Sequence, residues 1–105
     1  MKAAFLIKPS KVFDKPLVIK NVKNKDLAND EVRIRVKSCG ICKLDLELIE
    51  GKREREISEK FPIIPGHEVI GIIDEIGKNV HELNEGDRVA LGLIYDSCNS
   101  CDACQ

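Results

Sequence analysis

The sequence predicts a mainly β, barrel-like domain with one or two short helices. Apolar and β-branched runs are short and lie between turn residues, and no region alternates strands with long helices as a βαβ fold does. The residues from about 96 to 105 are polar and rich in cysteine, which is typical of a small lobe. With 105 residues and 43% apolar content, the chain can form one domain with one modest core.

Three strands are expected in the first part of the chain. Residues 2–7 and 17–22 are short apolar or β-branched runs, and Pro9 and Pro16 separate them. In residues 31–37, valine and isoleucine alternate with charged side chains. This alternation predicts a strand that buries its apolar face.

A short helix and a longer strand are expected next. The apolar spacing in residues 43–49 allows a helix that ends at Gly51. Residues 61–65 contain two prolines, which lack backbone donors, so this segment is expected to be extended but not a central strand. The β-branched content of residues 68–76 favours a strand, bent at Gly71.

The last part of the chain should contain a turn, a strand and the cysteine-rich lobe. Residues 84–87 read Asn-Glu-Gly-Asp, which is a turn sequence. Residues 88–94 are apolar enough for a further strand, and the lobe follows over about 96–105.

Charge and hydropathy exclude several classes of partner. Seventeen basic residues nearly balance eighteen acidic ones, for a net charge of -1, so no broad field attracts nucleic acid or an anionic membrane. No apolar run reaches the roughly 18 residues of a membrane-spanning helix, and the first residues lack a signal-peptide core. We therefore expect a cytoplasmic protein.

The cysteines indicate metal binding. Five is an odd number, and in a reducing compartment it favours metal ligation over a disulfide framework. Cys39 and Cys42 form a CxxC pair, which can bind metal or carry out redox chemistry. We expect Cys39 to be a small buried thiol.

His67 is the strongest single candidate for a ligand. A lone histidine is more often structural, but this one lies between Gly66 and a predicted strand, with Glu68 beside it and Cys42 upstream. Imidazole and thiolate are zinc ligands, and catalytic zinc sites use three protein ligands and leave a fourth position open.

Four motifs follow one another in a characteristic order and spacing. They are Cys39-Gly40-Ile41-Cys42-Lys43-Leu44-Asp45, Gly66-His67-Glu68-x-x-Gly71-x5-Gly77-x-x-Val80, Glu85-Gly86-Asp87-Arg88-Val89 and Cys98-x-x-Cys101-x-x-Cys104. Across nearly the whole chain they resemble the zinc-containing alcohol dehydrogenases of the medium-chain dehydrogenase/reductase superfamily. The resemblance covers only the N-terminal catalytic domain, and it implies that residues 1–105 form a GroES-like, partly open β-barrel with a cysteine-rich zinc lobe.

The resemblance also implies roles for four residues of the catalytic site. Cys42 looks like the thiolate ligand of the catalytic zinc, and His67 like its imidazole ligand. Glu68 is similar to the adjacent carboxylate that can approach the metal when its ligation changes. Asp45 matches the acid that holds the ring of the ligating histidine, as metal-bound imidazoles generally require.

Two neighbouring positions concern cofactor binding and the transfer of the alcohol proton. Lys43 occupies a position where family members often have a basic residue that faces the cofactor pyrophosphate; an ordinary surface lysine is the alternative. Leu44 departs from the family, which usually has Ser or Thr there to relay the proton of the alcohol. Either water or another group replaces this relay, or the site no longer turns over alcohols.

The cysteine lobe resembles the structural zinc site of the family. Cys98, Cys101 and Cys104 match the first three ligands, and the fourth cysteine would lie beyond residue 105. An iron–sulfur cluster is the alternative, but it also needs a fourth thiolate, and the other motifs do not resemble a ferredoxin. We expect this site to hold zinc more readily than the pair Cys42 and His67, whose third ligand would come from elsewhere.

The function implied is oxidation of a small alcohol to an aldehyde or ketone, with NAD or NADP as the hydride acceptor. No GxGxxG motif or βαβ unit is present, so the Rossmann domain that binds this cofactor is absent from the 105 residues. We expect the chain to be truncated and inactive alone. The alternatives are a stand-alone GroES-like module that binds zinc or a partner, and one chain of a split dehydrogenase. Self-association is a further expectation, because a missing partner domain would leave apolar surface exposed.

Overall fold

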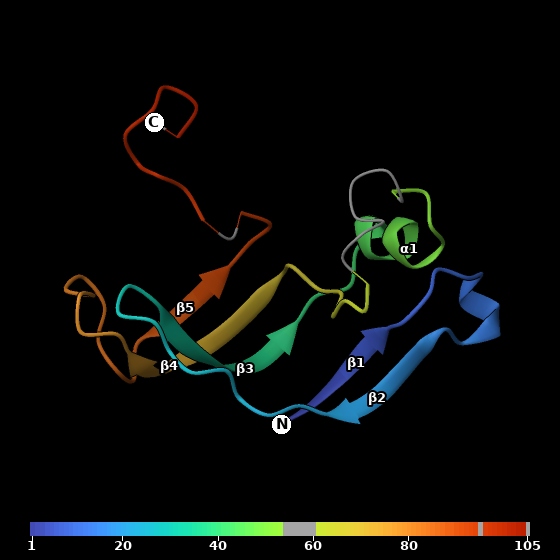
Figure 1. Cartoon of the computed structure of the whole chain (residues 1–105), viewed down its shortest axis with the longest axis horizontal. Coiled ribbons are helices and arrows are strands. Elements are labelled where there is room, and N and C mark those ends of the chain that lie inside the picture. The colour runs from blue at the N-terminus through green and yellow to red at the C-terminus, as the bar shows by residue number, and fades with distance from the viewer. Residues whose placement is uncertain (54–60, 95, 105) are drawn as a thin grey trace. The chain divides into compact units, whose positions relative to one another are not determined.

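The chain is mainly β, as the sequence predicts. The computed structural model describes residues 1–53, 61–94 and 96–104, and in these ranges it has five strands, one α-helix and one 3-10 helix. The strands form two sheets, neither of them closed (Figure 1). The residues fall into two compact units: Met1–Asp26 with Ile41–Gly66, and Leu27–Gly40 with His67–Gln105.

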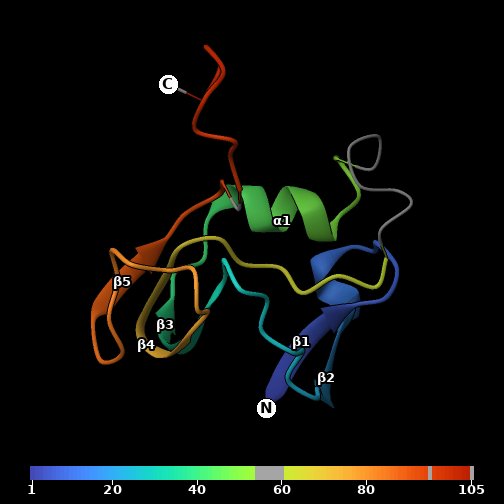
Figure 2. The same ribbon diagram turned by 60° about the vertical axis from the view of Figure 1, so that its left-hand side comes forward.

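The first unit contains a hairpin and a helix. Strands β1 (Lys2–Leu6) and β2 (Leu17–Asn21) are antiparallel, and the 3-10 helix η1 (Val12–Asp14) lies in the connection between them (Figures 1 and 2). Helix α1 covers Lys43–Ile49, the same residues that the sequence predicts. Both predicted strands of the hairpin are confirmed within one residue at each end.

Among the described residues, two apolar side chains form the core of the first unit. Leu6, at the end of β1, and Ile49, at the end of α1, are both buried. The backbone of Leu6 exchanges two hydrogen bonds with Ile63, at 2.8 and 3.1 Å. The segment around Ile63 is thus extended and makes only an isolated bridge, as its prolines predict.

The second unit is a three-stranded antiparallel sheet. Its strands β3 (Val32–Cys39), β4 (Val69–Ile76) and β5 (Arg88–Leu91) lie in the order β3-β4-β5. Ile73, on the central strand, is its fully buried apolar side chain. The β3–β4 register shifts between Val36 and Ser38, opposite Gly71 and Ile70.

The shift in register coincides with a close approach of the two strands. A β-carbon at Gly71 would overlap a methyl group of Ile34 and lie 2.6 Å from the carbonyl oxygen of Arg35. The bend that the sequence predicts at Gly71 is therefore a site where only glycine fits against the neighbouring backbone.

Two details of the sheet differ from the sequence prediction. Strand β5 ends at Leu91 and not at residue 94, because Leu91 pairs with Val69, the first residue of β4, and no further partner continues the ladder. Val36 was expected on a buried face, yet 54% of it is exposed. In the second half of β3 the side chains on both faces are exposed, so the alternation of valine with charged residues does not bury Val36.

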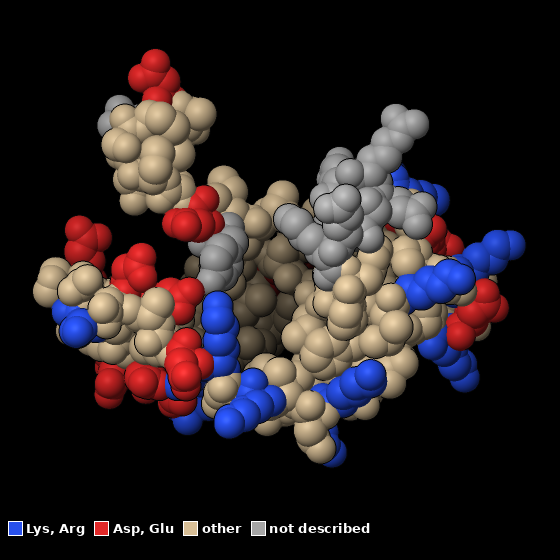
Figure 3. All heavy atoms as spheres, viewed as in Figure 1, with Lys and Arg blue, Asp and Glu red and all other residues tan. Residues whose placement is uncertain are grey.

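Charged side chains are distributed unevenly over the second unit. Figure 3 shows acidic side chains gathered over the connection between β4 and β5, which contains Glu82, Glu85 and Asp87. None of the helices in the described ranges has the length and apolar content that crossing a bilayer requires.

Candidate metal centres

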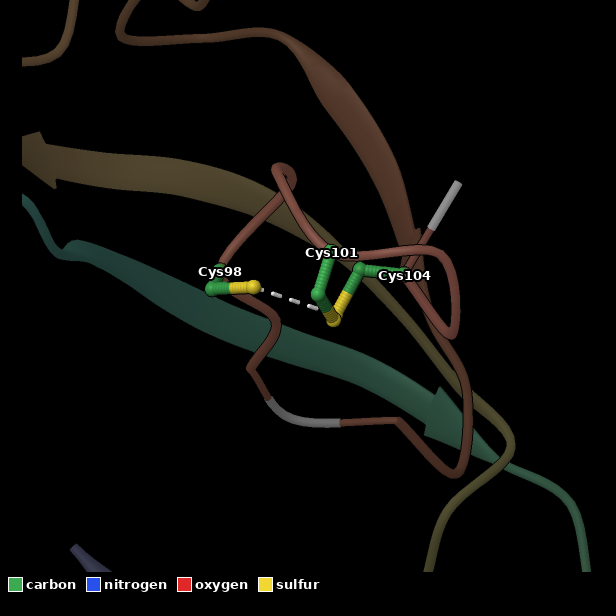
Figure 4. Close-up of side chains that lie close together, drawn as sticks. All are labelled: Cys98, Cys101 and Cys104. Carbon is green, nitrogen blue, oxygen red and sulfur yellow. Dashed lines mark hydrogen bonds between the residues drawn. The ribbon is translucent and has the colours of Figure 1, made fainter.

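The three cysteines of the lobe come together as the sequence predicts. The sulfur atoms of Cys98, Cys101 and Cys104 all lie within 4.8 Å of one another, and Cys104 is 3.5 Å from Cys98 and 3.4 Å from Cys101 (Figure 4). A turn closed by the Cys104 N–H, which donates to the Cys101 carbonyl at 3.0 Å, brings the last two together. The predicted lobe extends to Gln105, which lies outside the described residues.

These separations fit a zinc ion. With Zn–S bonds of about 2.3 Å and tetrahedral angles, two thiolates on one zinc are about 3.8 Å apart, close to the observed distances. All three cysteines are exposed, so a metal can reach them without unfolding of the core. Three soft thiolate donors also suit zinc chemically.

The loop around Cys98 makes this thiol more acidic than a free one. Hydrogen bonds from the side chain and backbone of Ser100, with further ones from Cys101, stabilise the thiolate and lower the pKa of Cys98 to about 6. Ser97 lies in the same loop, and its hydroxyl group is 2.7 Å from the amide oxygen of Asn99. The thiolate is the form that binds metal, so this loop favours ligation.

Cys42 is fixed by the helix that follows it. It is the N-cap residue of α1, with extended backbone angles of φ -127° and ψ 174°. Its backbone N–H donates to the Asp45 carboxylate at 3.0 Å, and Asp45 is buried although it carries a charge. The carboxylate at the third helical position thus satisfies a backbone donor at the start of the helix and complements the helix dipole.

Sequence reasoning missed this capping role of Asp45. The pattern of a cap residue followed by an acid three positions later was present, but cysteine is an unusual cap residue and was considered only as a ligand. The capping bond sets the backbone at Cys42, which makes Asp45 structurally important whether or not a metal is bound.

His67 and Glu68 belong to the second unit and immediately precede β4. Gly66, which comes before them, has a φ of 126°, a conformation that favours glycine. The carbonyl group of Glu68 accepts a hydrogen bond of 2.9 Å from the Gly40 N–H. An open hollow of about 370 Å³ lies beside this pair and is walled mainly by apolar groups, including Ile70 and Leu91.

The remaining candidates lie at the surface of helix α1 and of strand β3. The Lys43 side chain is 88% exposed, and its Nζ is 3.8 Å from a carboxylate oxygen of Glu47. Leu44, at the position of the usual hydroxyl residue, is half-buried. Cys39 was expected to be buried, but it is exposed, like the other side chains in the second half of β3, where nothing in the described residues covers either face.

Comparison with known proteins agrees with this combination of fold and motifs. Residues 28–105 match the alcohol dehydrogenase GroES-like domain. An alcohol dehydrogenase of Geobacillus stearothermophilus is 40% identical over 104 residues, which are 99% of this chain and 29% of that protein.

Solved structures show the same relationship. A cinnamyl alcohol dehydrogenase of Sorghum bicolor superposes with a TM-score of 0.79 at 28% identity, over 98% of this chain and 27% of the other. The CAD protein of Helicobacter pylori, solved in complex with NADP(H), gives 0.78 at 32% identity, over 98% and 28% of the two chains.

The fold and the motifs define the N-terminal domain of a medium-chain dehydrogenase. The chain belongs to the alcohol dehydrogenase GroES-like domain family. It spans somewhat under a third of the length of the relatives that it matches.

Proposed function

We propose that this chain provides the zinc-binding catalytic domain of a zinc-dependent alcohol dehydrogenase. The reaction is oxidation of a small alcohol to an aldehyde or ketone, with hydride transfer to NAD or NADP. The observation that carries this proposal is the match of residues 28–105 to the alcohol dehydrogenase domain, with the ligand motifs in register.

The catalytic residues of this proposal are Cys42, His67 and Glu68. Cys42 and His67 would hold a zinc ion, which when bound polarises the alcohol oxygen and lowers its pKa. Glu68 supplies a carboxylate next to the ligand, and Asp45 orients the imidazole of His67. Thiolate, imidazole and carboxylate are all established zinc donors, so this set suits the metal chemically.

Removal of the alcohol proton follows another route than in most relatives. Leu44 has no hydroxyl group, so it cannot pass a proton on. We assign this step to water, which can enter the open hollow beside His67 and Glu68. Lys43, at the start of α1, remains the candidate for contact with the cofactor pyrophosphate.

The cysteine cluster provides the structural zinc site of this proposal. Cys98, Cys101 and Cys104 lie at distances that suit thiolates on one metal ion. A zinc bound here would tie together a polar lobe that lies outside the sheet.

By itself, the chain is expected not to oxidise alcohols. The 105 residues contain no GxGxxG motif to bind the nicotinamide cofactor. We expect no alcohol-dependent reduction of NAD or NADP by the purified chain, with or without added zinc, as followed by absorbance at the wavelength of the reduced cofactor. Turnover that disappears in a Cys42→Ala variant would refute this inactivity.

Self-association is part of the same proposal. Phe13 is 90% exposed and Ile41 86% exposed, and the first unit also exposes Val12, Leu17, Val18 and Ile19. We expect a concentration-dependent rise in mass in sedimentation experiments, and a smaller rise for a Phe13→Ser variant. A mass that stays monomeric at all concentrations contradicts this expectation.

A further inference from the structure

Glycine at position 40 leaves a space that the Glu68 side chain fills. A β-carbon built on Gly40 would overlap Oε2 of Glu68, and it would lie 3.1 Å from the Cβ and 3.3 Å from the Cδ of that residue. The two backbones are also joined, because the Gly40 N–H donates to the Glu68 carbonyl at 2.9 Å. The Glu68 carboxylate therefore lies across the end of β3, where another residue would place its side chain.

The need for glycine here comes from space and not from backbone conformation. The described glycines with a positive φ are Gly51, Gly66 and Gly86, and Gly40 is not one of them. Another residue could adopt the backbone of Gly40 without strain. What it could not do is leave the Glu68 carboxylate where it is.

We propose that Gly40 is a positioning residue for Glu68. By lacking a β-carbon, it lets the carboxylate fold over the end of β3 and keeps its charge near the backbone next to His67. The use of this carboxylate, to attract a metal ion at His67, rests on the proposed function. The positioning itself rests only on the contacts of Gly40 with Glu68.

A methyl group at position 40 should move the carboxylate without unfolding the chain. Glu68 is exposed, and the overlapping atom is the end of its flexible side chain, which can turn into solvent. The Cβ of Glu68, at 3.1 Å, needs to move by only a few tenths of an ångström. Gly71 is different, because a methyl group there would meet the carbonyl oxygen of Arg35 at 2.6 Å, and a backbone carbonyl cannot move aside. Gly40→Ala should thus change the position of the Glu68 carboxylate without unfolding the chain.

The first test needs no metal. In the metal-free chain labelled with ¹³C, Gly40→Ala should shift the side-chain carboxyl resonance of Glu68. Gly92→Ala is the matched control, since a β-carbon at Gly92 meets nothing within 4 Å. An unchanged Glu68 resonance in a folded Gly40→Ala chain would overturn the proposal.

The second test measures zinc affinity in a Cys101→Ser background, by competition with a chromogenic chelator. A carboxylate held near a cation raises its affinity, so Gly40→Ala and Glu68→Gln should each weaken binding by roughly 10-fold, and the double variant no further. If Gly40→Ala weakened zinc binding as much in the Glu68→Gln variant as in the chain that keeps Glu68, Gly40 would act only on the fold. That result would overturn the proposal.

A further variant keeps the proposal testable if Gly40→Ala does not fold. Glu68→Asp keeps the charge but shortens the side chain by one methylene group, so its carboxylate cannot occupy the position that Oε2 of Glu68 has beside Gly40. It should lose as much zinc affinity as Gly40→Ala, and wild-type affinity would contradict the proposal. If His67→Ala leaves zinc affinity unchanged in the Cys101→Ser background, the proposed zinc site at His67 is wrong, while the carboxyl resonance still decides whether Gly40 positions Glu68.

Discussion

Cys98, one of the three clustered cysteines of the lobe, is more acidic than a free thiol. Hydrogen bonds from Ser100 and then Cys101 lower the pKa of Cys98 to about 6, from 9.0 for a free thiol. Between these two pH values Cys98 is mainly thiolate, whereas a thiol with an ordinary pKa is mainly protonated. Cys98 should therefore react with an electrophile at a lower pH than an ordinary thiol does.

Alkylation of the metal-free chain should detect this difference. Because the thiolate is the nucleophile, we expect iodoacetamide to label Cys98 already near pH 6 to 7. Ser100→Ala removes the largest cause of the shift, so it should raise the pH at which Cys98 is half labelled. Mass spectrometry of the labelled peptides gives the pH profiles. A Cys98 profile that Ser100→Ala leaves unchanged would contradict this assignment.

At the scale of residues, the sequence predicted which side chains cluster better than it predicted which side chains are exposed. The spacing of Cys98, Cys101 and Cys104 was enough to expect a cluster, because a CxxCxxC run in a loop can bring its sulfur atoms together. The exposure of Cys39 was not predictable, since it depends on which parts of the sheet other segments cover in the folded chain. The contact of Glu68 with Gly40 was equally hidden, because it joins residues that are close only in the folded chain.

Helix α1 shows how an element can carry part of a site. It begins at Lys43, directly after Cys42, and its first turn contains the buried Asp45. The bond from the Cys42 N–H to the Asp45 carboxylate closes the start of the helix at 3.0 Å. The orientation of the Cys42 backbone therefore depends on helix capping.

Loss of this cap should destabilise the metal-free chain. Asp45→Ala removes the acceptor, and we expect the free energy of unfolding to fall by about 1 kcal/mol, as for other helix caps. Asp45→Asn retains an oxygen acceptor and is expected to lose less. Urea titrations followed by circular dichroism give both values. Equal losses in the two variants would show that the charge, and not the hydrogen bond, is what matters.

At the scale of elements, periodicity and turn residues located most of the fold. Helix α1 and strands β1 and β2 lie within one residue of the predicted ranges, since prolines and Gly51 mark their ends. The end of β5 was missed by three residues, because the end of a strand is set by its partner and not by its own sequence. The 3-10 helix at Val12–Asp14 had no periodic signal, being only three residues long.

At the scale of the whole chain, the proposed metal ligands belong to two different compact units. Cys42 and Asp45 belong to the first compact unit, and His67 and Glu68 to the second. The cysteine cluster lies entirely within the second unit and uses residues from a single loop. Zinc at the cluster therefore needs only local order, whereas the proposed catalytic ligands come from both units.

This difference predicts an order of zinc affinity. The cluster offers three thiolates, while the Cys42 and His67 pair offers one thiolate and one imidazole, so the cluster should bind zinc more tightly. Dialysis against increasing concentrations of a chelator should remove zinc from the catalytic ligands first. Since bound zinc stabilises only the folded chain, its removal should also lower the melting temperature.

Zinc content of the purified chain and of two variants tests the central claim most directly. After dialysis against a weak chelator, we expect one tightly held zinc per wild-type chain, almost none in Cys101→Ser, and a content close to wild type in His67→Ala. Zinc retained in Cys101→Ser and lost in His67→Ala would reverse the predicted order. A wild-type chain that holds no zinc would contradict the proposal that this is a zinc-binding dehydrogenase domain.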